Sequence, residues 1–433
     1  MSNSGRWFRL DNAAKIFPSV ISPRRTTLFR VSARMYEPVN LDMLKQALEK
    51  TYERFPYYRV RMKTGFFWYY FEECQEIPEI EADSRYPCVW YKNQNPQRFP
   101  LRVRVFDRQI AVEMFHSLTD GTGATEFLKT LISLYFNIRY GVQTPPNEGV
   151  LLPGDEWLEE EAEDSFSKHY NSSIPKSALP PKAFHVPGKL AEPGVYYITT
   201  ATIPMAQLKD TAKKLGVTVT VLLTALYFWT FYLIQKTSDK KDKNPIIIQI
   251  PVNLRKILDS SSMKNFFLLV FPSIDSRLGE YSFEEILNYV KYYFKLEINK
   301  KSILQQIKRN VSSEKNIFAR LTPLFIKNII LSKVYESWGD MRATSSLSNM
   351  GLIKLPEEIE KYIERFDFYP PPNPTMKVCC TAVAFKDKVN ISFGRSIEET
   401  TVEKTFFAML KQYSMNIFVE TNYKYEEHKG VML

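Results

Sequence analysis

Apolar side chains recur along this chain at two spacings, every second residue in some segments and every third or fourth in others. In the first part of the chain, alternation predicts a strand over 26–36 and two hairpins, which turn at Gly65 and at Asp107. A helical spacing follows Asn40 and stops before Pro56. The order of these segments predicts a mixed α/β unit that opens as strand, helix and strand.

A second helical pattern covers 122–140, directly after the strand that the second hairpin ends on. The stretch FHSLTDGTG, which starts at Phe115, lies between that strand and this helix. It is therefore expected to form a strand-to-helix loop that carries His116.

The second half of the chain repeats the mixed pattern. Strands are predicted over 196–203, 246–251, 265–272, 378–385 and 389–393, and helices over 206–215, 219–235, 283–294, 321–335 and 402–417. Between the two halves, prolines accumulate around an acidic run at 155–164, which is expected to be solvated. We therefore predict an α/β protein of mixed sheets with an N-terminal lobe over 1–144, a linker over 145–195, a C-terminal lobe over 196–433 and a cleft between the lobes.

Two features bear on the cellular setting. The segment 217–234 carries no charge, but its threonines and the low mean hydropathy of −0.28 for the whole chain favour a buried helix over a membrane span. The adjacent pair Cys379 and Cys380 lies in a predicted strand and is expected to hold two buried thiols. With no apolar signal segment near the first residue, a reducing, cytoplasmic protein is expected.

The chain is basic, with a formal net charge of +10. Its richest basic run, 236–243, is broken by Asp239 and Asp242 and reads as a solvated loop. Because nucleic-acid sites need clustered basic and aromatic residues, no nucleic-acid partner is expected, and the phosphates of a small cofactor suffice as the anion.

The loop after the second hairpin has the residue types of an acid–base site. A neutral imidazole is the readiest general base at neutral pH, so His116 at a strand end can take a proton from an attacking alcohol or amine. Gly121 and Gly123 allow a tight turn and a close approach of substrate. Asp120 either orients His116 or pairs with an arginine that holds the loop in shape.

These residues resemble a known superfamily. HSLTDG is similar to the HxxxDG motif of the chloramphenicol acetyltransferase-like acyltransferases, which include condensation domains, plant BAHD acyltransferases, wax ester synthases and alcohol O-acetyltransferases. Three further stretches match the superfamily in order: LDNAAKIFP at 10–18, FPYYRVRM at 55–62, and IPVNLRK at 250–256 followed by Asn265 and by TSSLSNMG at 344–351. The resemblance is nearest to the alcohol acetyltransferase and wax synthase side.

The resemblance implies roles for single residues. His116 would be the general base. Asp120, which Gly121 follows in the motif, would form a salt bridge that maintains the loop. The expected partner of Asp120 is Arg59, with Arg61 as the reserve choice.

Further residues are expected to bind substrate or cofactor. Asn253 and Arg255 either brace the turn after their strand or contact a phosphate of coenzyme A. The TSSLSNMG stretch offers Ser346, Ser348 and Asn349 as donors to a tetrahedral oxyanion, although a serine-rich turn explains each of them as well.

Two motifs of the superfamily are missing from this sequence, and their absence weighs against two of its classes of enzyme. Condensation domains usually carry a second histidine where Phe115 stands, and the DFGWG motif of the plant enzymes is absent. We expect direct transfer of an acyl group, acetyl above all, from coenzyme A to an apolar alcohol by a monomer that needs no metal and no resident cofactor. The alternatives are a binding protein that keeps the fold without turnover, and an enzyme that takes its acyl group from an acyl carrier protein.

Overall fold

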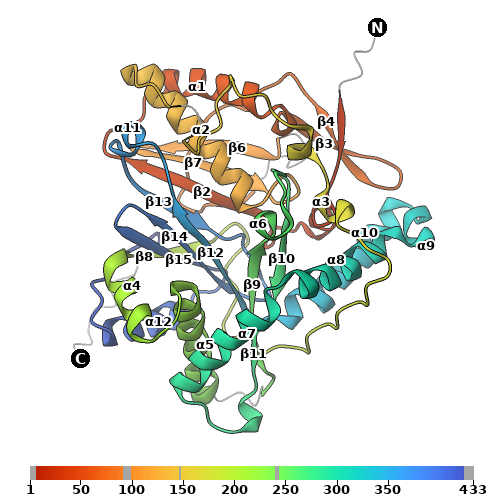
Figure 1. Ribbon diagram of the computed structural model, residues 1–433, viewed down its shortest axis with the longest axis vertical. Coiled ribbons are helices and arrows are strands. Elements are labelled where there is room, and N and C mark those ends of the chain that lie inside the picture. Colours follow the sequence, from red (N-terminus) through yellow and green to blue (C-terminus); the bar gives the residue numbers. More distant parts are fainter. Residues whose placement is uncertain (1–5, 91–98, 146–147, 239–242, 424–433) are drawn as a thin grey trace.

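A computed structural model describes residues 6–90, 99–145, 148–238 and 243–423 of the chain. Part of the basic run at 236–243 lies outside these residues. Figure 1 shows two lobes, one built around the strands and helices of the first 140 residues and one around those of the second half.

The N-terminal lobe is a sheet covered on one face by two helices. Its strands run in the order β13-β2-β7-β6-β5, with β13 over Ile363–Tyr369, β2 over Leu28–Met35, β7 over Gln109–Phe115, β6 over Leu101–Phe106 and β5 over Glu81–Ala82. The helices α1 (Leu41–Arg54) and α2 (Gly121–Tyr140) lie over this sheet (Figure 1). The side chain of Asn40 caps α1 by accepting from the amide of Met43, which confirms the predicted helix start.

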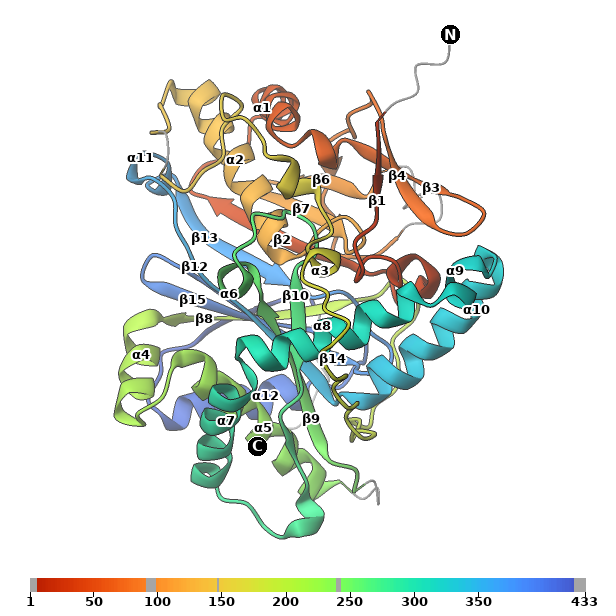
Figure 2. The same ribbon diagram turned by 45° about the vertical axis from the view of Figure 1, so that its right-hand side comes forward.

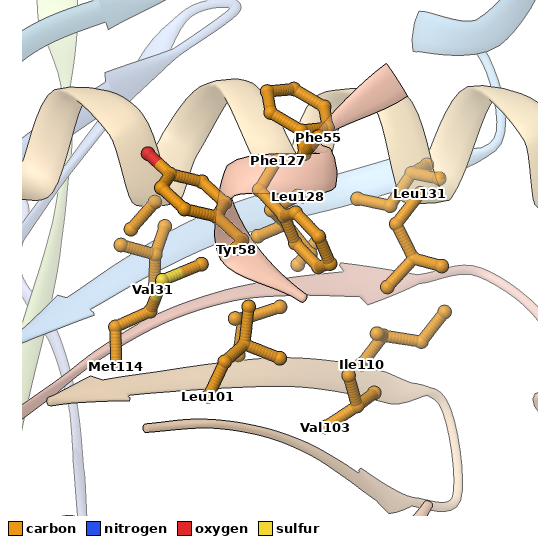
Figure 3. Packing of buried hydrophobic residues seen from close by; sticks show 14 of the residues in the cluster. Val31, Phe55, Tyr58, Leu101, Val103, Ile110, Met114, Phe127, Leu128 and Leu131 are labelled. Atoms are coloured by element: carbon orange, nitrogen blue, oxygen red, sulfur yellow. The ribbon is translucent and has the colours of Figure 1, made fainter. Parts of the chain in front are cut away.

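The core of this lobe fills the space between α2 and the sheet (Figure 3). Phe127, Leu128 and Leu131 point down from α2 onto strand residues such as Val103 and Ile110, and all five are fully buried. The helical and alternating spacings in the sequence thus come from two elements that bury their apolar faces against each other.

The C-terminal lobe is a larger sheet with a buried helix against it. Its strands run in the order β10-β9-β12-β14-β15-β8-β16, and β11 (Ser273–Ile274) pairs with β9. The strand bounds are β10 Phe267–Val270, β9 Ile246–Asn253, β12 Ser345–Ile353, β14 Val378–Phe385, β15 Lys388–Arg395, β8 Tyr197–Pro204 and β16 Phe418–Thr421. Helix α5 (Val219–Thr237) lies among α4 (Met205–Lys214), α7 (Phe283–Glu297) and α12 (Thr401–Gln412).

Helix α5 contains the uncharged segment that reaches the length of a membrane span. In the described part of the chain it is the single helix long and apolar enough to cross a membrane, and 67% of that apolar window is buried inside the protein. Its leucine, phenylalanine and tyrosine side chains pack into the core of the C-terminal lobe. The expectation of a buried helix agrees with this packing.

One strand corrects the predicted division of the chain. Strand β13 (Ile363–Tyr369) comes from the second half but pairs antiparallel with β2, so it belongs to the sheet of the N-terminal lobe. The side chain of Asn390 on β15 donates to the carbonyl of Phe366 at 2.7 Å, and Thr381 on β14 donates to the carbonyl of Phe368. The segment 196–433 therefore does not form one lobe, because β13 crosses over and ties the two sheets together.

Two other expectations need correction. The stretch around Ser346 is not a turn but the strand β12, which pairs in parallel with β9 and β14. In the acidic run, Glu161 is buried rather than solvated, with its carboxylate 2.9 Å from the guanidinium of Arg54 and 2.6 Å from the hydroxyl of Tyr57. A buried carboxylate is stable here because both of its oxygens have charged or hydroxyl donors.

Three further features complete the fold. A small sheet of β1 (Trp7–Arg9), β4 (Tyr69–Glu73) and β3 (Val60–Thr64) lies beside the N-terminal lobe, and its β3–β4 hairpin contains Gly65 as predicted. The helices α8 (Lys300–Lys315), α9 (Ile317–Leu321) and α10 (Leu324–Val334) form one side of the molecule, and α8 was not predicted from the sequence. All four cysteines are buried and unbridged, which confirms the buried thiols at 379 and 380.

Candidate active site

The stretch HSLTDG lies, as predicted, between the end of β7 and the start of α2. The side chain of Asp120 caps α2 by accepting from the amides of Thr122 at 3.0 Å and Gly123 at 3.3 Å. A carboxylate at this position satisfies amides that have no partner within the helix and interacts favourably with the helix dipole. The first turn of α2 and the loop before it are therefore fixed by one side chain.

The same carboxylate forms a two-pronged ion pair with Arg255, the first residue of the short helix α6 (Arg255–Leu258). Nη1 of Arg255 lies 2.9 Å from Oδ2 of Asp120 and Nη2 lies 3.1 Å from Oδ1, and both side chains are at least nine-tenths buried. The amide of Phe266 also donates to Asp120, at 3.0 Å. The loop is thus clamped to the C-terminal lobe.

The expected pairing of Asp120 with Arg59 is wrong. Arg59 follows the short helical turn before β3, and its guanidinium donates to the carbonyl of Gln75. The reserve choice, Arg61, is also directed toward this segment and lies 3.4 Å from the carboxylate of Glu76. Arg59 precedes β3 and Arg61 lies within it, whereas β9 ends opposite the first turn of α2 and delivers Arg255 there.

The ion pair also revises the expected contact between Arg255 and a cofactor phosphate. A guanidinium has five N–H donors. In Arg255 they reach the two oxygens of Asp120, the carbonyls of Ser262 and Lys264, and the side-chain oxygen of Asn253. Every donor is engaged within the protein, so Arg255 holds the loop and has no donor left for a phosphate.

Asn253 takes part in the same clamp. Its oxygen accepts from the amide of Arg255 at 3.0 Å, and its nitrogen donates to the hydroxyl of Thr122 at 3.1 Å. These contacts match the bracing role that the sequence left open for Asn253.

His116 is held by Asn265, which lies just before β10. Oδ1 of Asn265 is 2.9 Å from Nδ1 of His116, while Nδ2 of Asn265 donates to the backbone carbonyl of His116 at 2.9 Å and to Oδ2 of Asp11 at 3.0 Å. Because the amide nitrogen faces two acceptors, the amide oxygen is the group that faces the ring. Nδ1 of His116 must then carry the proton, which leaves the lone pair of the neutral imidazole on Nε2.

Asp11 orients Asn265 in turn. This fully buried carboxylate accepts from the amide of Ala14 at 2.8 Å, from the amide of Asn265 at 3.2 Å and from the side chain of Asn265. Burial raises the pKa of Asp11 to about 7, and the nearby carboxylate of Asp164 acts in the same direction. Asp11 thus acts on the histidine through one asparagine.

Aromatic rings surround the imidazole. Phe17 stacks on it with ring centroids 4.6 Å apart, and the rings of Phe29 and Phe267 lie at 4.9 and 5.6 Å. Burial lowers the pKa of His116 from its ordinary value of 6.5, against the opposing effects of Asp120 and the Asn265 hydrogen bond. The ring is therefore kept neutral at pH 7, the state that a general base needs.

Close packing, not flexibility alone, explains Gly123. A Cβ atom at this position would lie 2.1 Å from the hydroxyl of Thr119, 2.2 Å from that of Tyr58 and 2.5 Å from the carbonyl of Met263. The hydroxyls of Thr119 and Tyr58 both donate to that carbonyl, at 2.6 Å each. At Gly121 a Cβ would meet the flexible side chain of Met350, with its sulfur at 2.8 Å and its Cε at 3.2 Å, and the ring of Phe368 at 3.6 Å.

The serines and the asparagine of the TSSLSNMG stretch fall on two faces of β12. Asn349 donates to the hydroxyl of Thr220 on α5 at 3.0 Å and accepts from the amide of Gly351 at 2.9 Å, so its amide is engaged on the α5 side and the expected oxyanion contact is not supported. By the alternation of a strand, Ser346 and Ser348 lie on the other face. Their proposed contact with an oxyanion stays a prediction.

Several residues at the site were missed as site residues. Asp11, Phe17 and Asn265 belong to stretches whose pattern was noticed, but the sequence alone did not show that these stretches meet at His116. One signal in the sequence could have pointed to Asp11. Its carboxylate stands in an apolar stretch, and the neighbouring Leu10 and Ala14 are buried as Asp11 is. Such a charge must have several hydrogen-bond donors around it.

Comparisons of the sequence with known families and curated proteins found no match. No known protein-family model matches the chain. No curated protein matches its sequence either.

Solved structures match the described chain over nearly its full length. Polyketide synthase associated protein 5 from Mycobacterium tuberculosis is 12% identical, with a TM-score of 0.62 over 95% of this chain and 98% of that one. Trichothecene 15-O-acetyltransferase TRI3 from Fusarium sporotrichioides is 13% identical, with a TM-score of 0.62 and 95% coverage of both chains. TRI101 from F. graminearum, solved with coenzyme A and deoxynivalenol, is 12% identical, with a TM-score of 0.61 over 95% and 99% of the two chains. The chain therefore has the two-lobed, chloramphenicol acetyltransferase-like fold that its motifs indicated.

Proposed function

We propose that this protein is an acyltransferase that moves an acyl group, acetyl above all, from coenzyme A to the hydroxyl of an apolar alcohol. The observation that carries the proposal is the state of His116. Asn265 fixes the proton on Nδ1, and the aromatic surroundings keep the ring neutral, so Nε2 is a base prepared to accept a proton.

The reaction follows from this geometry without a covalent enzyme intermediate. Nε2 of His116 takes the hydroxyl proton as the alcohol oxygen attacks the thioester carbonyl, which forms a tetrahedral oxyanion. The oxyanion collapses, the carbon–sulfur bond breaks, and the leaving thiolate receives the proton from His116. The products are the ester and free coenzyme A, and the histidine returns to its neutral state.

The oxyanion needs a hydrogen-bond donor, and the hydroxyls of Ser346 and Ser348 are the candidates. They lie on the face of β12 that is turned away from α5, and the next residue on that face, Met350, is the one that a Cβ at Gly121 would meet. One well-placed donor stabilises such a transition state by about 2.7–4 kcal/mol.

The nature of the acceptor follows from the walls around the base. Three phenylalanine rings line the imidazole, so an apolar alcohol loses little hydration on binding there. The TRI101 structures, which are similar in fold, contain coenzyme A together with deoxynivalenol or T-2 mycotoxin, and they support a small-molecule acceptor with a coenzyme A donor.

A second candidate function differs in the acyl donor, which would be an acyl carrier protein instead of coenzyme A. A peptide synthetase epimerization domain, from the third module of tyrocidine synthetase B, also shares the fold, with 14% identity and a TM-score of 0.59. Acetyl-coenzyme A and an acetylated carrier protein should therefore be offered in parallel to purified protein with a panel of alcohols. Ester formation from acetyl-coenzyme A alone supports the proposal, ester formation from the carrier alone replaces it, and no ester from either donor leaves a binding protein of this fold.

A further inference from the structure

Helices α9 and α10 expose an unusual number of large apolar side chains. Phe318 is 80% exposed and Phe325 67%, which are values typical of polar surface residues. Five more apolar residues on these two helices are exposed: Ile317, Leu321, Ile326, Ile329 and Ile330. A helix of a globular protein normally turns such residues toward the core, so a helix that shows them to solvent indicates a surface that is covered in use.

The tip of the β3–β4 hairpin extends this surface. Phe66 and Phe67 are exposed there, and the amide of Leu324 donates to the carbonyl of Phe66 at 2.8 Å. Lys327 connects α10 to the hairpin. Its buried ammonium donates to the carbonyl of Phe67 at 3.0 Å and lies 3.6 Å from the ring centre of Trp68. Figure 2 shows the hairpin and α9 side by side at one edge of the molecule.

We call this surface the apolar platform. It consists of nine exposed residues: Phe66, Phe67, Ile317, Phe318, Leu321, Phe325, Ile326, Ile329 and Ile330.

Basic residues border the platform. Lys315 ends α8 directly before α9, Arg320 lies on α9 and Lys333 on α10, and all three are exposed. No aspartate or glutamate occurs from 315 to 335, and the neighbouring acidic residues along the chain, Glu314 and Glu336, lie outside α9 and α10. Apolar side chains flanked by lysine and arginine are the pattern of helices that lie in the headgroup region of a bilayer. A membrane with anionic lipids attracts such a surface.

We propose that the apolar platform binds the surface of an anionic lipid bilayer, with α9 and α10 lying in the plane of the headgroups. A second copy of the chain fits less well, because the two basic borders would face each other without an acidic residue between 315 and 335 to balance them. The side chains also protrude singly from two short helices and a hairpin tip, a shape that suits insertion between lipids.

The platform is connected to the candidate base through one short helix. The 3-10 helix η1 (Phe17–Val20) packs on α10, where the hydroxyl of Ser19 donates to the side chain of Asn328 at 2.8 Å. Its first residue, Phe17, is the ring that stacks on His116. A bound bilayer would thus lie near the site and could supply membrane-dissolved alcohols, a consequence that rests on the proposed function, whereas lipid binding itself does not.

Flotation of the full-length protein with vesicles tests the proposal. The probes are vesicles of phosphatidylcholine alone and of phosphatidylcholine with phosphatidylglycerol. The platform variant carries Phe318→Ser, Phe325→Ser and Ile329→Ser. The matched control carries Phe106→Ser, Leu278→Ser and Leu296→Ser, three apolar residues that are 70–82% exposed elsewhere on the chain. Because all six side chains are exposed, both variants should fold.

We expect the wild-type protein and the control to float with the phosphatidylglycerol vesicles and the platform variant to stay behind. Replacing Lys315, Arg320 and Lys333 by glutamine should weaken binding to the anionic vesicles by roughly fivefold for each residue. The proposal is overturned if the platform variant floats as well as the wild type, or if the wild type binds neither vesicle. It is also overturned if the wild type forms a dimer without lipid that the platform variant lacks, which would assign the platform to a second copy.

Acetyl transfer to a water-soluble alcohol, measured without vesicles, separates this proposal from the proposed function. The platform variant should retain that activity. Loss of lipid binding with activity intact supports the platform, while absence of activity in the wild type contradicts the proposed function and leaves the lipid result to stand alone.

Discussion

Asn265 contacts His116 at two points, the ring nitrogen Nδ1 and the backbone carbonyl, both at 2.9 Å. The two contacts together determine which ring nitrogen carries the proton and how the ring is oriented. A single buried carboxylate, Asp11, holds the asparagine in this orientation. The candidate base and the two residues that prepare it therefore come from three distant parts of the chain.

Removing the asparagine should reduce catalysis without removing the base. In Asn265→Ala the imidazole loses the acceptor that fixes the Nδ1 proton, and we expect kcat to fall roughly a hundredfold. The same hydrogen bond raises the pKa of His116, so the acid limb of kcat/KM should move to lower pH in the variant. A loss of activity with an unchanged pH profile would indicate a role for Asn265 in folding only, which a thermal melt would reveal.

The pH dependence of the wild-type enzyme follows from the burial of His116. Its pKa is lowered from 6.5, and the reaction needs the neutral ring, so the acid limb of kcat/KM should be centred below pH 6.5. Initial rates over a pH series with buffer controls give this profile. An acid limb centred at or above 6.5 would contradict the assignment of His116 as the titrating base.

Breaking the clamp between the lobes should cost stability. Arg255→Ala leaves the buried carboxylate of Asp120 without its cation, and we expect the free energy of unfolding to fall by about 3–5 kcal/mol. Arg59→Ala is the matched control, because Arg59 donates to a carbonyl and its removal should cost about 1 kcal/mol. Urea unfolding of both variants measures these two losses in the free energy of unfolding. Equal losses would contradict the assignment of Arg255 as the partner of Asp120.

The close packing at the start of α2 can be tested with one methyl group. Gly123→Ala would place a Cβ within 2.5 Å of three oxygen atoms, so the variant should lose about 1–3 kcal/mol of stability as the loop shifts. Gly154→Ala, where a Cβ meets nothing within 4 Å, should change stability by less than about 0.5 kcal/mol. If both glycine variants melt at the wild-type temperature, the contacts around Gly123 do not constrain the loop.

The local elements could be predicted from the sequence because each is decided by nearby residues. Asn40 caps α1, the turn at Asp107 joins two alternating stretches, and the strand before His116 ends where its apolar alternation ends. What a pattern along the chain cannot supply is the pairing between distant elements. Strand β13, which was not predicted from the sequence, lies in the second half of the chain but pairs with β2.

The same limit explains the error at Asp120. The sequence correctly indicated that this carboxylate would be held by an arginine, but it put forward Arg59, with Arg61 in reserve, and assigned Arg255 to the turn after its strand or to a cofactor phosphate. Which one reaches Asp120 depends on where β9 ends relative to α2, which is a tertiary fact. Asn265 was likewise part of a recognised run, and its role became visible only when its side chain was placed beside His116 and Asp11.

The most direct test of the account is the release of free thiol from acetyl-coenzyme A in the presence of an alcohol panel, compared among wild type, His116→Ala and His169→Ala. His169, at the end of the short helix α3 (Ser165–Lys168), is the control for the loss of an imidazole elsewhere on the chain. We expect turnover by the wild type and the control, and a rate lower by about 10²–10⁴-fold in His116→Ala. Turnover by His116→Ala at the wild-type rate would contradict this expectation.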